Sequence, residues 1–175
     1  METLPVDRLQ DKIRHVLNTV PDQFLFVATA SQRLHLIRNS VADTSFTIST
    51  SWYGIGNREG SYMTPAGLHR VTEKIGAGAP SGRIFRDRID TGIDWQPDLT
   101  EDNQILTRII RMEGLEDGAN RGPGIDSCDR YIYIHGTNRE DRIGTPLSHG
   151  CILMRNNDII ELFDLIQEGT LVLID

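Results

Sequence analysis

The most reactive group in the sequence is the thiol of Cys151, which ends the run Ser148-His149-Gly150-Cys151. A further imidazole, His135, lies sixteen residues earlier. A thiolate attacks carbonyl carbons, so a base within hydrogen-bond reach would complete a nucleophilic site. Glycine before the nucleophile gives backbone N–H groups the freedom to turn toward an oxyanion. The spacing therefore predicts a cysteine-dependent acyl-transfer site.

These residues resemble a known family. His135-Gly136-Thr137, a loop and then Ser148-His149-Gly150-Cys151 are similar to the catalytic segment of the L,D-transpeptidases, whose domain is of the YkuD type. The turn Met63-Thr64-Pro65-Ala66-Gly67 and the segment Gln32–Arg38 are similar to other parts of that domain. The resemblance spans residues 23–175. It implies a β-sandwich-like catalytic domain that acts on peptidoglycan stem peptides.

The resemblance also implies a role for each residue of the motif. Cys151 is the nucleophile, and His135 is the general base that takes the thiol proton. The Gly136 carbonyl fixes the tautomer of His135. The backbone N–H groups of His149, Gly150 and Cys151 are the expected oxyanion donors. His149 is expected to line the pocket and to orient the thiol.

Stem peptides end in carboxylates, which an arginine can bind with two parallel hydrogen bonds. Arg155 is the basic residue that follows Cys151 most closely, and Arg139 lies in the loop before it. With Tyr133 and Ser148, they are the predicted substrate-binding residues. Many family members carry a polar residue two places after the nucleophile, where this chain has Leu153.

The reaction that the resemblance implies is attack of Cys151 on the carbonyl between diaminopimelate and D-Ala, which releases D-Ala and leaves a thioester. Water as acceptor would make the protein an L,D-carboxypeptidase that trims soluble muropeptides during recycling, and this is the expected reaction. An amine of a second stem peptide would instead give a cross-link. A module that binds peptidoglycan peptides without chemistry is the third alternative.

A zinc site is the chemical alternative, because His135, His149 and Cys151 are ligand types that zinc accepts. The His-x-Cys spacing is poor for it, and no carboxylate or second cysteine stands at a ligand spacing. We therefore expect neither a metal nor a cofactor. Cys128 is expected to be a small buried hydrophobic residue. Structural roles are expected for the other histidines, which are His15, His35 and His69.

The composition limits the partners. The 175 residues carry a formal net charge of −7, which argues against nucleic acid as a partner. The longest apolar run, Phe24–Ala28, is far shorter than the ~20 residues of a membrane helix, so no membrane insertion is expected. Charged residues interrupt the first twenty positions, so no signal peptide is predicted and a cytoplasmic location is expected. A chain shortened at its N-terminus would instead be consistent with a periplasmic protein.

The periodicity predicts a mainly β fold with flanking helices. Residues 1–22 are expected to form an amphipathic helix, over 6–19, that packs on a catalytic domain of residues 23–175. Strands are predicted at 24–29, 33–38, 46–50, 69–75, 104–112, 130–135 and 170–174, and a helix at 159–167. The pattern over 104–112 also suits a helix, but its β-branched content favours a strand buried on both faces. The glycine-rich loop before residue 130 is a candidate lid or a plain connection.

Overall fold

The structure is a computed structural model, and it describes residues 4–97 and 104–175. These residues form two α-helices, α1 (Val6–Leu17) and α2 (Asn156–Leu165), and a short 3₁₀ turn, η1 (Glu140–Arg142). The strands are β1 (Gln23–Ala28), β2 (Arg33–Arg38), β3 (Val41–Ser49), β4 (Gly67–Ile75), β5 (Arg83–Arg86), β6 (Ile89–Asp94), β7 (Ile105–Gly114), β8 (Tyr133–Gly136), β9 (Ile152–Met154) and β10 (Leu171–Ile174). The mainly β fold with flanking helices is confirmed.

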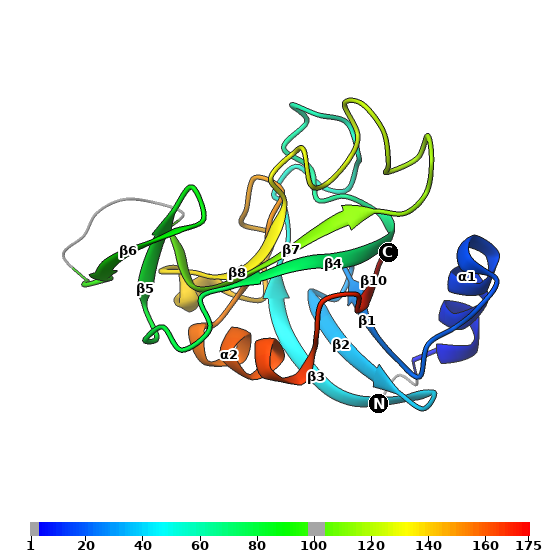
Figure 1. The fold of residues 1–175 in the computed structure, drawn as a ribbon, viewed down its shortest axis with the longest axis horizontal. Coiled ribbons are helices and arrows are strands. Elements are labelled where there is room, and N and C mark those ends of the chain that lie inside the picture. The colour runs from blue at the N-terminus through cyan, green and yellow to red at the C-terminus, as the bar shows by residue number, and fades with distance from the viewer. Residues whose placement is uncertain (1–3, 98–103) are drawn as a thin grey trace.

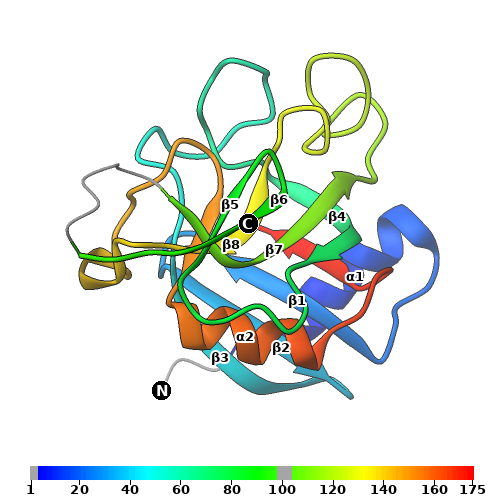
Figure 2. The same ribbon diagram turned by 60° about the vertical axis from the view of Figure 1, so that its left-hand side comes forward.

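The strands form one sheet in the order β4-β10-β1-β2-β3-β9-β8-β7-β5-β6. Strand β4 also pairs with β7, which closes the sheet from β4 to β7 around one core. Val27, Ile48 and Ile134, which come from three different strands, are fully buried in this core. The β5–β6 hairpin stands outside the ring and projects from its side (Figures 1 and 2). Opposite parts of the closed sheet thus face each other as the layers of a sandwich do.

The two helices pack on opposite faces of β1, because successive side chains of a strand point to opposite sides. Leu25 and Val27 face the core that α2 covers, whereas Phe24 and Phe26 face α1. Figure 1 shows α1 outside the sheet, at the opposite side of β1 from α2. Leu9 of α1 is 3% exposed, and full burial of such a side chain contributes about 1.5–3 kcal/mol. The helix predicted at 6–19 ends two residues earlier, at Leu17. Residues 1–3 of the predicted N-terminal segment lie outside the described residues.

Strand β7 confirms that residues 104–112 form a buried strand rather than a helix. Its alternating pattern is broken because tertiary contacts cover both faces. Thr107 lies at a bulge in β7 and has a φ of +74°, a value that is rare for a β-branched residue. At this bulge the strand passes from its partner β5 to its partner β4.

Several predicted boundaries near the site are wrong. The helix predicted at 159–167 begins three residues earlier, at Asn156, and ends at Leu165, with Arg155 at the N-cap. The strand predicted at 130–135 begins at Tyr133, since Tyr131 has a left-handed φ of +55°. Strand β3 begins five residues earlier than the predicted 46, at Val41. Strands β5, β6 and β9 were not predicted.

Two long loops rise side by side from the same end of the sheet, residues 52–66 and 115–132 (Figures 1 and 2). They are joined by the Asn57 side-chain amide, which donates to the Ala119 carbonyl at 2.9 Å, and by the Glu59 N–H, which donates to the Gly124 carbonyl at 2.7 Å. The loop before residue 130 is therefore held by its neighbour. Neither of the described helices is long and apolar enough to cross a membrane.

Candidate active site

The turn that carries Cys151 is held by hydrogen bonds within itself. The Ser148 hydroxyl donates to the Cys151 carbonyl at 2.5 Å and accepts from the Gly150 N–H at 3.2 Å. Gly150 has a φ of +128°, which favours glycine. A Cβ at this position would stand 2.6 Å from Cδ1 of Ile132. Gly150 is therefore required both by its backbone and by the space available.

Two further segments hold this turn from outside. The buried Thr64 hydroxyl donates to the Gly150 carbonyl at 3.0 Å and accepts from the Ser51 N–H at 2.9 Å. The Trp52 N–H donates to the Ser148 carbonyl at 3.0 Å. The turn at Met63–Gly67 thus contacts the turn that carries Cys151 directly, although 86 residues separate Thr64 from Gly150.

The parallel pairing of β8 with β9 brings Cys151 and His135 to one face of the sheet. Ile134 pairs with Ile152 and His135 with Leu153, so Cys151 stands beside Tyr133. The Tyr133 N–H donates to the Cys151 Sγ at 3.4 Å. Because alternate residues of a strand share a face, His135 lies two positions further along the face that carries Cys151. The structure thus brings together the two residues on which the predicted chemistry depends.

The Cys151 thiol is neutral at ordinary pH. Its Sγ packs against an apolar cluster that includes Phe85, Ile109 and Tyr133, although part of the residue remains exposed. Burial raises the pKa of the Cys151 thiol to about 11, and the Tyr133 N–H and the positive charge of Arg130 oppose that rise. The thiol donates to the Tyr131 carbonyl, with 3.7 Å between Sγ and oxygen.

His135 is neutral as well, and its tautomer follows from its partner. The ring is 3% exposed, and Nδ1 lies 2.7 Å from the Gly136 carbonyl oxygen. A carbonyl can only accept, so Nδ1 carries the hydrogen and Nε2 carries the lone pair of a base. Burial lowers the pKa of His135 to about 4, and the hydrogen bond to Gly136 opposes that shift. The pair is therefore a thiol and an imidazole rather than a preformed ion pair.

Gly136 is packed too closely for any side chain. A Cβ there would stand 2.5 Å from Oδ1 of Asn156 and 2.7 Å from the Leu106 carbonyl oxygen. Asn156 is fixed in turn, because Oδ1 accepts from the Thr107 hydroxyl at 2.6 Å and Nδ2 donates to the Thr137 carbonyl at 3.0 Å. The strained Thr107 and the first residue of α2 thus hold the carbonyl that orients His135.

The two arginines predicted to bind substrate, Arg155 and Arg139, lie beyond the ends of β9 and β8 that are remote from Cys151. Arg155 follows the last residue of β9, so four extended residues, ~13 Å of chain, separate it from Cys151. Arg155 contacts Asp158 instead, with 3.9 Å between nitrogen and oxygen. Arg139 follows the corresponding end of β8 and caps η1. Because β8 and β9 are parallel, both arginines stand away from the end that carries Cys151.

Two other arginines, Arg130 and Arg88, contact residues around the thiol. The guanidinium of Arg130 is half-buried, donates to the carbonyls of Gly56 and Met63 at 3.1 and 2.6 Å, and contributes positive charge near Cys151. Arg88 lies in the turn between β5 and β6 and donates to the Tyr133 hydroxyl at 3.2 Å. Neither was predicted, because both lie on loops without periodicity and only the folded chain brings them to the site.

Tyr133 and Ser148 are nearer the nucleophile but differ in what they offer a substrate. Tyr133 lines a cavity of about 510 Å³ together with Asp87, Arg88, Ile105 and Tyr131. Ser148 is 3% exposed, and its hydroxyl is engaged inside the turn. Its place is therefore structural, and we do not retain Ser148 as a substrate-binding residue.

His149 is exposed beside two tyrosines. Its ring centroid lies 5.7 Å from that of Tyr53 and 5.8 Å from that of Tyr62. Trp52, next to Tyr53, is 71% exposed. These four residues, Trp52, Tyr53, Tyr62 and His149, are called the aromatic wall below. Of the three expected oxyanion donors, the Gly150 N–H is engaged by the Ser148 hydroxyl.

The other chemical residues have structural partners. His69 is fully buried, with Nδ1 3.0 Å from the Gly67 carbonyl and Nε2 2.8 Å from the Ser127 hydroxyl. Cys128 is not the buried hydrophobic residue that was predicted. It is partly exposed, and its Sγ accepts from the Arg111 guanidinium at 3.3 Å. Within residues 4–97 and 104–175, no three His, Cys, Asp or Glu side chains are arranged to hold a metal.

Leu153 occupies a position with no access to a substrate. It is 2% exposed and lies in the middle of β9, where it pairs with Ser49 of β3 and His135 of β8. An apolar side chain suits this packed environment. The substitution of a polar family residue by leucine thus changes the packing beside His135 rather than a surface of the cleft.

Comparison with known sequences gives one family. The sequence model of YkuD, described as the L,D-transpeptidase catalytic domain, matches residues 22–174. The putative L,D-transpeptidase YqjB of Bacillus subtilis is 42% identical over 92 residues, which cover 44% of this chain and 52% of that protein. The putative L,D-transpeptidase YkuD of the same organism is 50% identical over 79 residues, 41% of this chain and 48% of its own length. The chain thus spans about half the length of these curated relatives.

Comparison with solved structures gives the same fold at low sequence identity. L,D-transpeptidase 3 from Mycobacterium tuberculosis superimposes with a TM-score of 0.55 and 14% identity, over 89% of this chain and 61% of that one. An L,D-transpeptidase from Mycobacterium smegmatis gives a TM-score of 0.52 and 12% identity, over 88% of this chain and 58% of that one. At these identities the likeness concerns the fold alone.

Proposed function

Because this chain belongs to the YkuD family of L,D-transpeptidase catalytic domains, an enzyme class, we propose that it transfers acyl groups of peptidoglycan stem peptides through a thioester on Cys151. The observation that carries the proposal is the face that Cys151 shares with His135 in the paired strands β8 and β9. The Nε2 lone pair of His135 is the base, and its orientation is fixed by the Gly136 carbonyl. The bond under attack is the one between diaminopimelate and D-Ala.

The neutral state of the pair defines the order of the steps. A thiol with a pKa of about 11 and an imidazole with a pKa of about 4 do not exchange a proton in the free enzyme. The S–H bond, which points to the Tyr131 carbonyl in the free protein, turns to Nε2 of His135 when substrate binds. Proton transfer then accompanies attack of sulfur on the carbonyl carbon, so no free thiolate accumulates.

The remaining steps return the proton. Attack gives a tetrahedral oxyanion, which the N–H groups of His149 and Cys151 are best suited to hold. Each such donor contributes about 3 kcal/mol of transition-state stabilisation when it is well aimed. Collapse breaks the C–N bond, and protonated His135 gives its proton to the departing amine of D-Ala. The thioester and a neutral imidazole remain.

Water is the acceptor expected from the sequence, and the partial exposure of Cys151 leaves water a route to the thioester. His135 takes a proton from the water as it attacks the thioester carbonyl carbon. Collapse breaks the C–S bond, His135 returns the proton to the Cys151 sulfur, and the tripeptide carboxylic acid is released. An amine of a second stem peptide is the other candidate acceptor. It is favoured by the aromatic wall, which gives a second peptide an apolar surface on the His149 side of the nucleophile.

Mass spectrometry of the intact protein tests the thioester. Incubation with a disaccharide tetrapeptide should add the mass of the acyl group, without D-Ala, to the protein. Cys128→Ala should still acquire the adduct, because its thiol contacts Arg111 and not the site. Cys151→Ala should acquire none. An adduct on Cys151→Ala, or D-Ala release by that variant, would refute the assignment of the nucleophile.

The products identify the acceptor. With the tetrapeptide as sole substrate, hydrolysis gives tripeptide and free D-Ala in equal amounts, whereas cross-linking gives a dimer. We expect tripeptide as the main product. Predominant dimer would replace water by the amine acceptor and leave the Cys151 mechanism unchanged. Tight binding of the tetrapeptide with neither product would favour the non-catalytic module.

A further inference from the structure

A cavity of about 510 Å³ lies next to two residues, Tyr131 and Tyr133, whose backbones contact the Cys151 thiol. It is lined by Asp87, Arg88, Ile105, Tyr131 and Tyr133. Two of these residues also contact the thiol through their backbones, since the Tyr133 N–H donates to Sγ and Sγ donates to the Tyr131 carbonyl. The cavity and the thiol thus have Tyr131 and Tyr133 as common neighbours.

The wall of the cavity carries both signs of charge. Arg88 donates to the Tyr133 hydroxyl at 3.2 Å, and its guanidinium lies 5.4 Å from the centre of the Tyr131 ring. A guanidinium has five N–H donors, and within the described residues the side-chain hydrogen bond that Arg88 makes is the one to the Tyr133 hydroxyl. Asp87, the preceding residue, is exposed and also lines the cavity. The apolar surface between them comes from Ile105 and the two tyrosine rings.

The backbone at this position is held in an uncommon conformation. Asp87 and Arg88 have φ values of +49° and +68°, and they form the two-residue turn between β5 and β6. Such a turn favours Asn-Gly, because other side chains are strained at positive φ. The sequence keeps two charged residues there instead. Asp87 and Arg88 thus line the cavity although their positive φ values are energetically unfavourable for residues with side chains.

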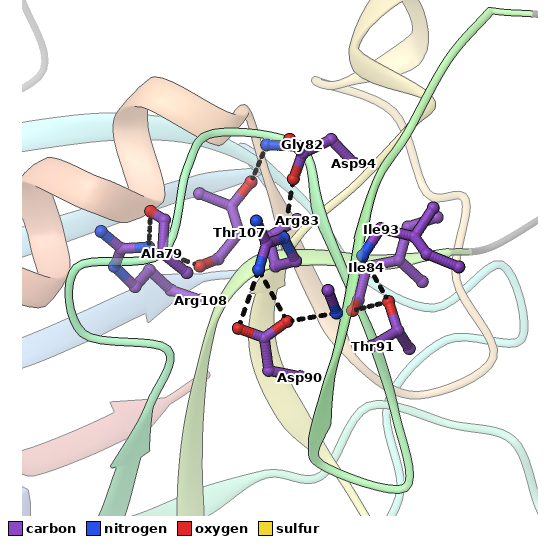
Figure 3. A network of polar contacts seen from close by, with 11 residues as sticks. Ala79, Gly82, Arg83, Ile84, Asp90, Thr91, Ile93, Asp94, Thr107 and Arg108 are labelled. Atoms are coloured by element: carbon purple, nitrogen blue, oxygen red, sulfur yellow. Dashed lines mark hydrogen bonds and ion pairs between the residues drawn. The ribbon is translucent and has the colours of Figure 1, made fainter.

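Ion pairs and hydrogen bonds between polar side chains join the two strands of the hairpin that carries this turn. Figure 3 shows Arg83 of β5 between Asp90 and Asp94 of β6, with nitrogen–oxygen distances of 2.9 and 2.7 Å. The Thr91 hydroxyl donates to the Ile84 carbonyl at 2.8 Å. The turn is therefore carried on a braced hairpin, and this preorganises Arg88 toward the cavity.

We propose that this cavity binds the side chain of the third stem residue, with Arg88 holding its carboxylate and Asp87 its ammonium group. The proposal rests on the proposed function, which makes diaminopimelate the residue whose carbonyl is attacked. Its side chain is an apolar stem that ends in an amine and a carboxylate on one carbon. Ile105, Tyr131 and Tyr133 contact the stem. Lysine at the same position offers the amine alone.

The test compares D-Ala release from three tetrapeptides that differ only in the third residue: diaminopimelate, its side-chain amide, and lysine. D-Ala is released on acylation, so the readout does not depend on the acceptor. The wild-type protein should prefer diaminopimelate to lysine by roughly ten- to a hundredfold in kcat/KM, the range expected for a hydrogen-bonded charge pair. The amide should behave like lysine.

Arg88→Gln should remove that preference. Its kcat/KM should fall roughly ten- to a hundredfold for the diaminopimelate peptide and stay within about twofold for the lysine peptide. Arg88→Lys keeps the positive charge but loses the two parallel N–H donors of the guanidinium, so its preference for the diaminopimelate peptide should be intermediate. Arg14→Gln is the matched control. It removes the same charge from the exposed face of α1 and should change neither peptide.

Three outcomes would overturn the proposal. Equal rates of the wild-type protein on diaminopimelate and lysine peptides would exclude selection by this cavity and leave the Cys151 mechanism intact. An equal loss on both peptides in Arg88→Gln would assign Arg88 to the terminal carboxylate of D-Ala or to the hairpin. If no peptide releases D-Ala, the proposed function fails. Calorimetric affinity of Cys151→Ala for the same peptides then decides the cavity by itself, and no preference for diaminopimelate would refute it.

Discussion

Acid should destabilise this protein through two buried histidines well before its carboxylates are protonated. His135 and His69 are almost fully buried, and burial lowers the pKa of each to about 4, from the ordinary value of 6.5. In the unfolded chain both rings bind a proton as the pH falls through 6.5. In the folded protein they remain neutral until about pH 4. The stability that they contribute is therefore present above pH 6.5 and lost as the pH falls toward 4.

The magnitude follows from the two pKa values. At about pH 5 the unfolded form of each histidine is almost fully protonated and the folded form is almost fully neutral, which removes about 2 kcal/mol per residue relative to neutral pH. Two residues together remove about 4 kcal/mol, a large part of the stability of an ordinary domain. Below both pKa values, where the ring is protonated in the unfolded and the folded protein, the loss would reach about 3 kcal/mol per residue.

Urea unfolding at several pH values between about 7.5 and 4.5 measures this loss. His69→Asn keeps a side-chain donor toward the Gly67 carbonyl but does not titrate. It should lower stability at neutral pH and show about half the wild-type dependence on pH. His135→Asn should behave likewise, with Gly136 as the retained partner. If either variant kept the full wild-type slope, the ring in question would not be neutral and buried as described.

The remaining predictions concern the nucleophile and its turn. Gly150→Ala should lower the thermal midpoint more than Gly122→Ala, because both glycines have a φ near +126° but only the first would bring a Cβ to 2.6 Å from Ile132; equal shifts would show that backbone strain alone sets the cost. The rate of Cys151 alkylation by iodoacetamide should rise with pH up to a midpoint near 11, and a midpoint near the ordinary thiol value would contradict the burial of Sγ. Arg130→Gln should slow this alkylation severalfold at pH 8, since the guanidinium lowers the pKa of the thiol, and an unchanged rate would exclude that coupling.

The sequence by itself was sufficient to predict the family, which the match of the YkuD model to residues 22–174 confirms. Cys151 and His135 stand in short motifs whose residue types are meaningful without neighbours, and local periodicity was enough to place most strands of the sheet. It also predicted that His69 has a structural role. Where a strand is short or buried on both faces, the local pattern is weak, and for this reason β9 was missed and β7 remained ambiguous from periodicity alone.

The position of charge around the thiol was decided only by the tertiary structure. Arg155 is four residues from Cys151 in the chain, yet the extended path of β9 carries it away. Arg130 instead brings its charge near the thiol from a loop, and Arg88 reaches the hydroxyl of the neighbouring Tyr133 from the turn between β5 and β6. The number of residues between two positions predicts their distance in space only when both lie in the same helix or strand. Beyond it, strand pairing and loop closure set the neighbours, and these depend on the whole sheet. The protonation states of Cys151 and His135 have the same origin, because burial is a property of the folded chain.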